Sequence, residues 1–238
     1  MIITISRQVA TNGELIGRAV AERLGLRFFD RELVDELARR LQVDPNVVLQ
    51  FDESLLNPIQ SVIREWQTNI NEQTYIHSLR QALQRILHEG NAVVIGRGGN
   101  FVMRCPDCLQ VRIVAPLALR RAIYRTSHDV SEREAERLII RGDRERANFV
   151  KLFFHADIDD PVNYDVTLNL TGLSPETAVD IIVNAAKDRA AQQVPFEVEA
   201  TLPYHVAIMA RHRHPIRPSM IEPEGGIEPE EGENRKIA

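Results

Sequence analysis

Three groups of residues in this chain have the types and spacing that phosphate chemistry requires. The first is the polar turn Ser6–Gly13, which lies between an apolar run and an amphipathic helix pattern. The second is Arg97, directly after the apolar run 92–95, and the third is the arginine-rich segment 137–151. Free N–H groups at a helix start bind anions, and arginine binds phosphate oxygens in a bidentate manner. Together they indicate chemistry on a phosphate group.

The arginine-rich segment also has a purely structural interpretation. Glutamates are interleaved with its arginines, at Glu132, Glu134, Glu136 and Glu145. Helical Glu–Arg pairs on a solvated face would give the same pattern without any function. Both interpretations stay open on the residues alone.

Alternating apolar runs and helical patterns over residues 1–190 predict the elements that position these groups. Strands are expected at about 2–5, 26–29, 92–95, 111–114 and 166–170. Helices are expected at about 14–24, 33–41, from 45, 59–89, 119–126, from 132 and 175–190, with Ser131 and Glu134 as a capping box. This alternation predicts an α/β fold with a parallel sheet flanked by helices, in which ligands bind at the carboxyl ends of the strands.

The composition excludes several classes of function. A net charge of −5 over 238 residues argues against a general nucleic-acid binder. No apolar stretch approaches the length of a membrane-spanning helix, and the first residues lack a signal-peptide pattern. We therefore expect a cytoplasmic protein with neither nucleic acid nor membrane as a partner.

The two cysteines, Cys105 and Cys108, form a CxxC in the segment RCPDCLQ. A structural zinc site needs four ligands, and no second pair stands at matching spacing. A redox CxxC would be expected near a helix start after a strand, whereas this pair precedes a strand-like run. We therefore predict an ordinary loop here, without a disulfide framework.

The composition changes in the C-terminal extension, residues 191–238. Apolar and polar residues alternate over 196–202, which could add one strand. From Arg211 the sequence is rich in proline and charge, and this predicts a flexible tail. We interpret His212 and His214 as part of that tail rather than as a metal site.

The motifs ITISRQVATNG, VVIGRGGNFV and RGDRERANFVKLFF, followed by DDPVNYDVTLNLTGLSPETAVDII, resemble the cytidylate kinase-like family in order and spacing. The resemblance covers about residues 1–190. It implies a five-stranded parallel sheet of the P-loop nucleoside monophosphate kinase type, with a helical NMP-binding insertion at 59–89 and a mobile lid at 131–155. It also implies a kinase that uses ATP and Mg²⁺ to phosphorylate a pyrimidine nucleoside monophosphate, with cytidine monophosphate favoured.

The resemblance also assigns roles to individual residues. The phosphate loop that binds ATP would comprise Ser6, Arg7, Ala10, Thr11, Asn12, Gly13 and Glu14. The lid would supply Arg141, Arg144 and Arg146 as catalytic arginines, alongside Asp143. The acceptor would be bound by Asp30, Arg31 and Arg97, and the pairs Asp160-Pro161 and Tyr164-Asp165 complete the family pattern. No residue is assigned to a metal.

The phosphate loop departs from the pattern that it resembles. A standard loop reads GxxxxGK[ST], and the family typically reads GSGG followed by arginine, whereas residues 10–14 read Ala-Thr-Asn-Gly-Glu. Glu14 puts an anion where an anionic phosphate should bind. Its carboxylate must therefore turn away, hold Mg²⁺, or signal that ATP binding has been lost.

These departures keep other functions open. A nucleotide-binding pseudokinase or regulatory protein with a degenerate phosphate loop is the first alternative, and its acidic tail could serve a protein partner. A kinase of another acceptor, of the shikimate type, is the second, although the long 59–89 segment argues against it. A homo-oligomer formed through the 59–89 helices and Trp66 stays a further interpretation.

Overall fold

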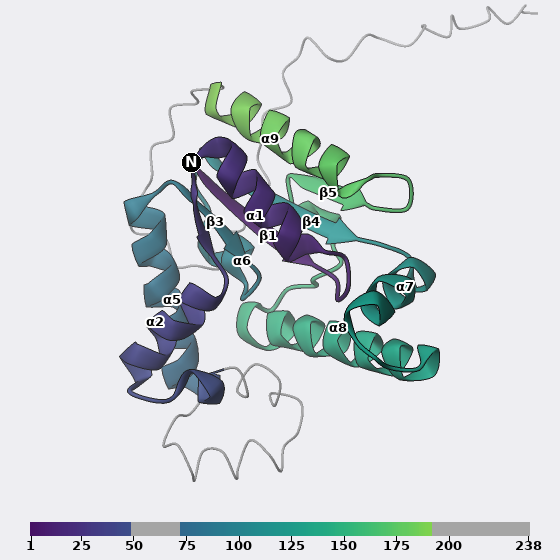
Figure 1. The fold of residues 1–238 in the computed structure, drawn as a ribbon. Coiled ribbons are helices and arrows are strands. Elements are labelled where there is room, and N and C mark those ends of the chain that lie inside the picture. Colours follow the sequence, from purple (N-terminus) through teal and green to yellow (C-terminus); the bar gives the residue numbers. More distant parts are fainter. Residues whose placement is uncertain (49–71, 192–238) are drawn as a thin grey trace, which may run out of the picture. The chain divides into compact units, whose positions relative to one another are not determined.

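The computed structural model describes residues 1–48 and 72–191, and its elements alternate as expected (Figure 1). The strands are β1 (Ile2–Arg7), β2 (Arg27–Phe29), β3 (Ala92–Ile95), β4 (Cys108–Val114) and β5 (Val166–Asn169). The helices are α1 (Gly13–Leu24), α2 (Arg31–Leu41), α5 (Glu72–Glu89), α6 (Gly99–Val102), α7 (Leu117–Ser127), α8 (Glu132–Phe154) and α9 (Pro175–Ala191), with a 3₁₀ turn η1 (Pro161–Asn163). Residues 45–48 are also helical, after Asp44 as expected.

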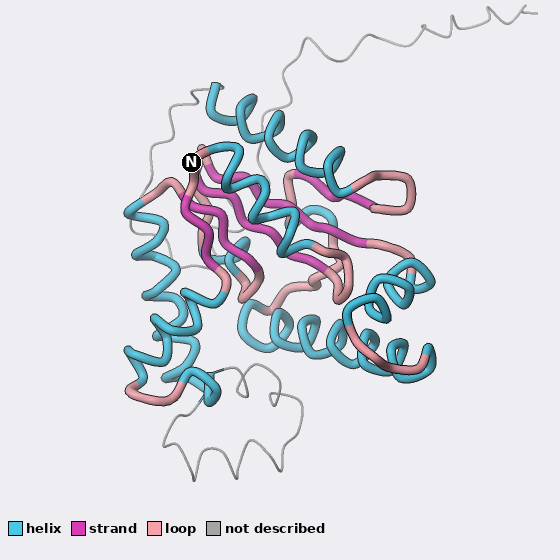
Figure 2. The backbone as a smooth tube through the Cα atoms, in the orientation of Figure 1, coloured by secondary structure: helices cyan, strands magenta, loops and turns pink. Residues whose placement is uncertain are grey.

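The five strands form one parallel sheet in the order β2-β3-β1-β4-β5 (Figure 2). The central strand β1 pairs with β3 on one side and β4 on the other, with Ile2 opposite both Ala92 and Cys108. Chain order reverses about β1, so the carboxyl ends of β1, β3 and β4 meet at a topological switch point. The predicted five-stranded parallel fold is confirmed.

The two faces of the sheet are buried by different helices, because successive side chains of a strand point to opposite faces. Ile3 and Ile5 belong to a core shared with α1 and α9. Ile2 belongs to a second core that includes residues of α2, α5 and the end of α8. Figure 1 shows α1 and α9 together on one face, with α8 on the other.

Some boundaries differ from those expected. β4 begins at Cys108 rather than at 111, because Gln110 and its neighbours already pair with β1 despite the polar side chain. The predicted lid region is one continuous helix of 23 residues, α8. It begins at the expected capping box, where the Glu134 N–H donates to Ser131 Oγ at 3.2 Å.

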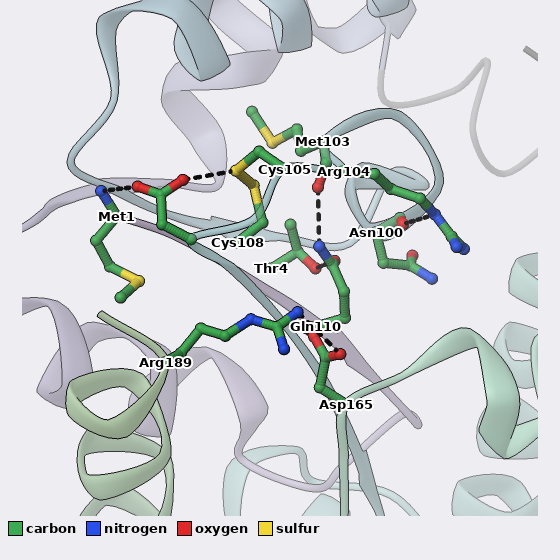
Figure 3. Close-up of a disulfide and its surroundings, with 11 residues drawn as sticks. Met1, Thr4, Asn100, Met103, Arg104, Cys105, Cys108, Gln110, Asp165 and Arg189 are labelled. Carbon is green, nitrogen blue, oxygen red and sulfur yellow. Dashed lines mark hydrogen bonds and ion pairs between the residues drawn. A yellow bond between two sulfur atoms is a disulfide. The ribbon is translucent and has the colours of Figure 1, made fainter. Parts of the chain in front are cut away.

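The prediction of an ordinary loop at the CxxC is wrong, because Cys105 and Cys108 form a disulfide (Figure 3). The Cys108 N–H donates to the Cys105 carbonyl (3.1 Å), and this tight turn brings the two Cα atoms to 4.9 Å. That separation lies within the usual range for disulfides. The pair lies at the amino end of β4, the end of the sheet opposite the switch point.

The remaining predictions concern other parts of the chain. The described residues, 1–48 and 72–191, belong to one compact unit. The predicted strand at 196–202, the flexible tail with its histidines and residues 59–71 of the insertion lie outside the described residues. Within 1–48 and 72–191, every helix is too short or too polar to cross a bilayer.

Candidate functional site

The turn between β1 and α1 is tied to the end of β4. The Gln8 N–H donates to the Ile113 carbonyl, and Gln8 Oε1 accepts from the Ala115 N–H, both at 3.0 Å. The buried Thr11 hydroxyl donates back to the Gln8 carbonyl at 2.9 Å. These bonds fix the course of the chain over residues 8–12.

The same turn has a left-handed backbone at two positions that are not glycine. Ala10 (φ 60°) and Asn12 (φ 55°) are both left-handed, a conformation that costs alanine about 1 kcal/mol or more and asparagine less. Among the described residues, the N–H groups of Ala10, Thr11 and Asn12 have no hydrogen-bond partner. Left-handed residues that expose successive N–H groups form a concave anion site at the start of α1.

The Glu14 carboxylate is directed along α1 rather than into this turn. Its side chain is 54% exposed and pairs with Arg18 one helical turn later, at 3.7 Å. This arrangement corresponds to the first of the three alternatives for Glu14, a side chain that turns away. The negative charge therefore does not occupy the anion site.

Arg7 connects the ends of three strands. Arg7 is the last residue of β1. Its Nη2 lies 4.0 Å from the carboxylate of Asp30, which follows β2. Its guanidinium fills the space that a Cβ at Gly96, after β3, would occupy. The Nη1 of Arg146, from α8, donates to the Arg7 carbonyl at 2.9 Å. Two guanidinium groups thus converge beside the turn.

The electrostatics of this cluster favour an anion. Burial, followed by the positive charges of Arg7 and Arg112, lowers the pKa of Arg146 to about 9. The opposing charges of Asp143 and Asp30 do not offset these effects. Because a bound phosphate would supply the missing negative charge, the cluster is suited to a phosphorylated ligand.

Arg112 adds a third cation, which is buried opposite Ser6 in the sheet register. Its Nη1 donates to Ser6 Oγ at 2.8 Å and its Nη2 to Asp159 at 2.7 Å, whereas its Nε has no partner within the described residues. The Tyr164 hydroxyl donates to the Ile158 carbonyl (2.8 Å) and lies 3.4 Å from Ser6 Oγ. Burial raises the pKa of Tyr164 despite its contacts with Ser6 and Arg112, so it stays a neutral donor.

Asp143 fastens α8 to the phosphate loop. One carboxylate oxygen accepts from the Val9 N–H at 2.8 Å, and the other pairs with the buried Arg120 of α7. Arg120 donates in turn to the Ala115 carbonyl at 2.9 Å. The turn, α7 and α8 are therefore joined through one partly buried ion pair.

The turn after β3 presents Arg97 at the same edge. Gly96, Arg97 and Gly98 are all left-handed, with φ of 69°, 51° and 67°. The Arg97 Nη1 donates at 3.2 Å to the hydroxyl of Tyr75, a fully buried residue of α5. The described part of the predicted insertion thus positions the arginine assigned to the acceptor.

The structure separates the predicted site residues into two sets. The phosphate-loop residues, Asp30 and Arg146 lie around the switch point, and Arg97 lies at the neighbouring strand end. Arg31, Arg141 and Arg144 are exposed, and Arg141 pairs with Glu145 at 2.7 Å.

Sequence reasoning missed Arg112 and Arg120. A charge inside an apolar strand was a signal for Arg112, but no pattern distinguishes Arg120 from the adjacent Arg121.

The carboxylates near the site leave little room for a protein-bound metal. Asp143 and Asp159 pair closely with buried arginines, and Asp30 has the longest ion pair of the three, 4.0 Å to Arg7. In the described residues, the group with the ligand types and spacing of a metal site is Cys105, Asp107 and Cys108, but the two sulfurs are joined in the disulfide and are not thiolate ligands. At the switch point, Mg²⁺ would fit if phosphate oxygens and water supplied most of its ligands, with Asp30 as the protein ligand.

Comparison with known proteins connects this geometry to a family. The model of the cytidylate kinase-like family matches residues 2–172. A comparison with curated proteins finds no match.

Among the solved structures that resemble the chain, two match it over 79% of its length and 98% of theirs. An uncharacterized protein from Eubacterium ventriosum ATCC 27560 has 17% identity and a TM-score of 0.61. Shikimate kinase from Bacteroides thetaiotaomicron has 15% identity and a TM-score of 0.50. The structural likeness shows a shared P-loop kinase fold. At identities this low it does not identify the substrate of this chain.

Proposed function

The chain belongs to the cytidylate kinase-like family, and from this premise we propose that it transfers the γ-phosphoryl group of ATP to a pyrimidine nucleoside monophosphate, with cytidine monophosphate as the preferred acceptor. The observation that carries the proposal is the group of arginines at the switch point, Arg7, Arg112 and Arg146, with Arg97 beside it. Such a concentration of partly and fully buried cations in an acidic protein is suited to an anionic ligand.

On the donor side, the N–H groups of residues 10–12 would bind the phosphates of ATP at the start of α1. Arg7 would replace the lysine of a standard phosphate loop, because its side chain runs from Gly13 in the turn to Gly96. Arg146, whose charge is poorly compensated without a ligand, would neutralise the transferring group. Mg²⁺ would supply further neutralisation of the phosphate oxygens.

On the acceptor side, Arg97 would hold the phosphate of the monophosphate, with Tyr75 fixing its orientation. An oxygen of that phosphate attacks the γ-phosphorus while the bond to the β–γ bridging oxygen breaks, giving a nucleoside diphosphate and ADP. This transfer depends on positioning and charge stabilisation, so it needs no side-chain base.

The test measures ADP formation by the full chain with Mg-ATP and each common nucleoside monophosphate. We expect turnover, fastest with cytidine monophosphate. Arg146→Met should lower kcat by about 10²–10³-fold, the usual effect of removing one preorganised transition-state contact. Arg97→Met should mainly raise KM for the acceptor.

Arg137→Met is the matched control, because Arg137 lies on α8 but is 66% exposed and pairs with Glu134. It should retain wild-type kinetics. Absence of turnover with every acceptor would overturn the proposed reaction.

A nucleotide-binding pseudokinase is the second candidate, favoured by Ala10, Asn12 and Glu14 in place of the usual loop residues. It would bind nucleotide without transfer. Calorimetry with ATP and cytidine monophosphate, beside the ADP assay, distinguishes the two functions.

A further inference from the structure

The disulfide between Cys105 and Cys108 lies outside the proposed kinase site. We propose that it is a thiol–disulfide exchange site, reduced reversibly by a dithiol or by a small thiol such as glutathione. The proposal is independent of the kinase activity, since it concerns the amino end of β4 (Figure 3).

The disulfide does little to hold this part of the fold together. Its two cysteines are only three positions apart, and the stabilisation that a disulfide gives by restricting the unfolded chain is smallest for the shortest loops. Other bonds already fix both ends of the turn. The Gln110 Nε2 donates to the Met103 carbonyl at 2.8 Å, and the Cys108 N–H donates to the Cys105 carbonyl. The turn therefore keeps its course when the S–S bond opens.

The two sulfurs differ in access. Cys108 is fully buried in the core between the sheet and its helices, whereas Cys105 is partly exposed. An incoming thiolate must reach a sulfur directly, so it attacks Cys105 Sγ. This breaks the Cys105–Cys108 bond, forms a mixed disulfide on Cys105 and releases Cys108 as a thiolate, which takes up a proton.

A second thiol completes the reaction. It attacks the sulfur of the reagent in the mixed disulfide, which frees Cys105 as a thiol and leaves the reagent as a disulfide. Two electrons pass from the two reagent thiols to the protein, and the reverse sequence restores the Cys105–Cys108 bond.

Asp107 gives the turn a partner for the reduced state. Its carboxylate lies 3.1 Å from Cys105 Sγ, so the reduced thiol donates a hydrogen bond to it. The other carboxylate oxygen pairs with the amino group of Met1 at 3.1 Å. The same negative charge repels an anionic reagent and slows its approach.

The first experiment uses the full wild-type chain in metal-free buffer with defined ratios of reduced to oxidised glutathione. Alkylation and mass spectrometry count the free thiols while circular dichroism monitors the fold. We expect a reversible two-electron transition with the native spectrum retained. A disulfide that opens only after unfolding in urea, or a pair that oxidised glutathione cannot close, would overturn the proposal.

A matched pair of variants tests the direction of attack. With oxidised glutathione, Cys105 in Cys108→Ser should form the mixed disulfide at least about tenfold faster than Cys108 in Cys105→Ser, because reactivity follows access. Equal rates would contradict attack at Cys105.

Asp107→Asn should speed the modification of Cys105 severalfold at low salt and less at high salt, because screening removes the repulsion. An unchanged rate would remove Asp107 from the site. These measurements use no kinase assay, so their outcome is separate from that of the proposed transfer.

Discussion

Two turns at the carboxyl edge of the sheet require left-handed backbone, and they meet that requirement differently. The phosphate loop after β1 uses Ala10 and Asn12, whereas the turn after β3 uses glycine at 96 and 98. At Gly98 a Cβ would overlap the ring of Phe154, the last residue of α8. The comparison shows that a left-handed backbone alone tolerates a side chain at moderate cost, and that close packing makes glycine obligatory.

The largest effect is expected when a methyl group is added to the tighter turn. Gly98→Ala combines a left-handed alanine with a clash against Phe154, and it should lower the free energy of unfolding by about 3 kcal/mol. Urea denaturation measures this loss. Gly25→Ala is the control, because Gly25 has φ 64° but open space around it, and it should cost only about 1 kcal/mol. Equal losses would show that packing contributes nothing.

The bond between α8 and the phosphate loop should give the next effect. Asp143→Ala leaves the buried Arg120 and the Val9 N–H without their acceptor and should cost roughly 3 kcal/mol. Asp180→Ala removes a 56% exposed partner of Arg23, itself 39% exposed, and should cost less than about 1 kcal/mol. Thermal and urea unfolding of both variants measure the difference. Similar losses would mean that Asp143 does not hold the loop.

Stability should depend on pH through Arg146. Its pKa is lowered to about 9 in the folded protein, so between pH 9 and about 12 the unfolded chain binds the proton that the folded chain has lost. Stability from this group therefore rises with pH in that window, by at most about 1.4 kcal/mol per unit. The free energy of unfolding of Arg146→Met is subtracted from that of the wild-type chain at each pH from 8 to 10.5, and this difference isolates the contribution of Arg146. A flat difference would contradict the shift.

The smallest effect should come from relieving the looser turn. Ala10→Gly removes the cost of a left-handed alanine and should stabilise the chain by about 1 kcal/mol. Asn12→Gly should change stability by less, because asparagine adopts this conformation more readily. Urea denaturation of the two variants measures which one changes the free energy of unfolding more. Destabilisation by Ala10→Gly would show that the methyl group makes a contact worth more than the strain.

Most of the fold could be predicted from the sequence, because apolar runs and helical periodicity determine which faces are buried. The early start of β4 was missed because Gln110 satisfies its polar side chain only through the Met103 carbonyl and Thr4, contacts that no local pattern reveals. The disulfide was missed for a related reason. It depends on a turn geometry that spacing alone does not specify.

The candidate site was predictable only in part. Arg146 could have been separated from Arg141 and Arg144, since it continues the buried stripe of α8 formed by Ala135, Ile139 and Val150. A charged residue within an apolar stripe points to a buried partner or ligand. The left-handed Ala10 had no such signal, because it is fixed by the distant bonds of Gln8 to β4 and of Val9 to Asp143.

The continuity of α8 has a consequence for how the two halves of the proposed site communicate. Asp143 and Arg146 contact the donor loop, and eight residues after Arg146, about 12 Å along a rigid rod, Phe154 packs at the turn that carries Arg97. A shift of α8 on binding ATP would therefore move Phe154 and the turn that carries Arg97, where the acceptor is proposed to bind. We therefore expect each substrate to change the dissociation constant of the other by the same factor, as thermodynamic linkage requires.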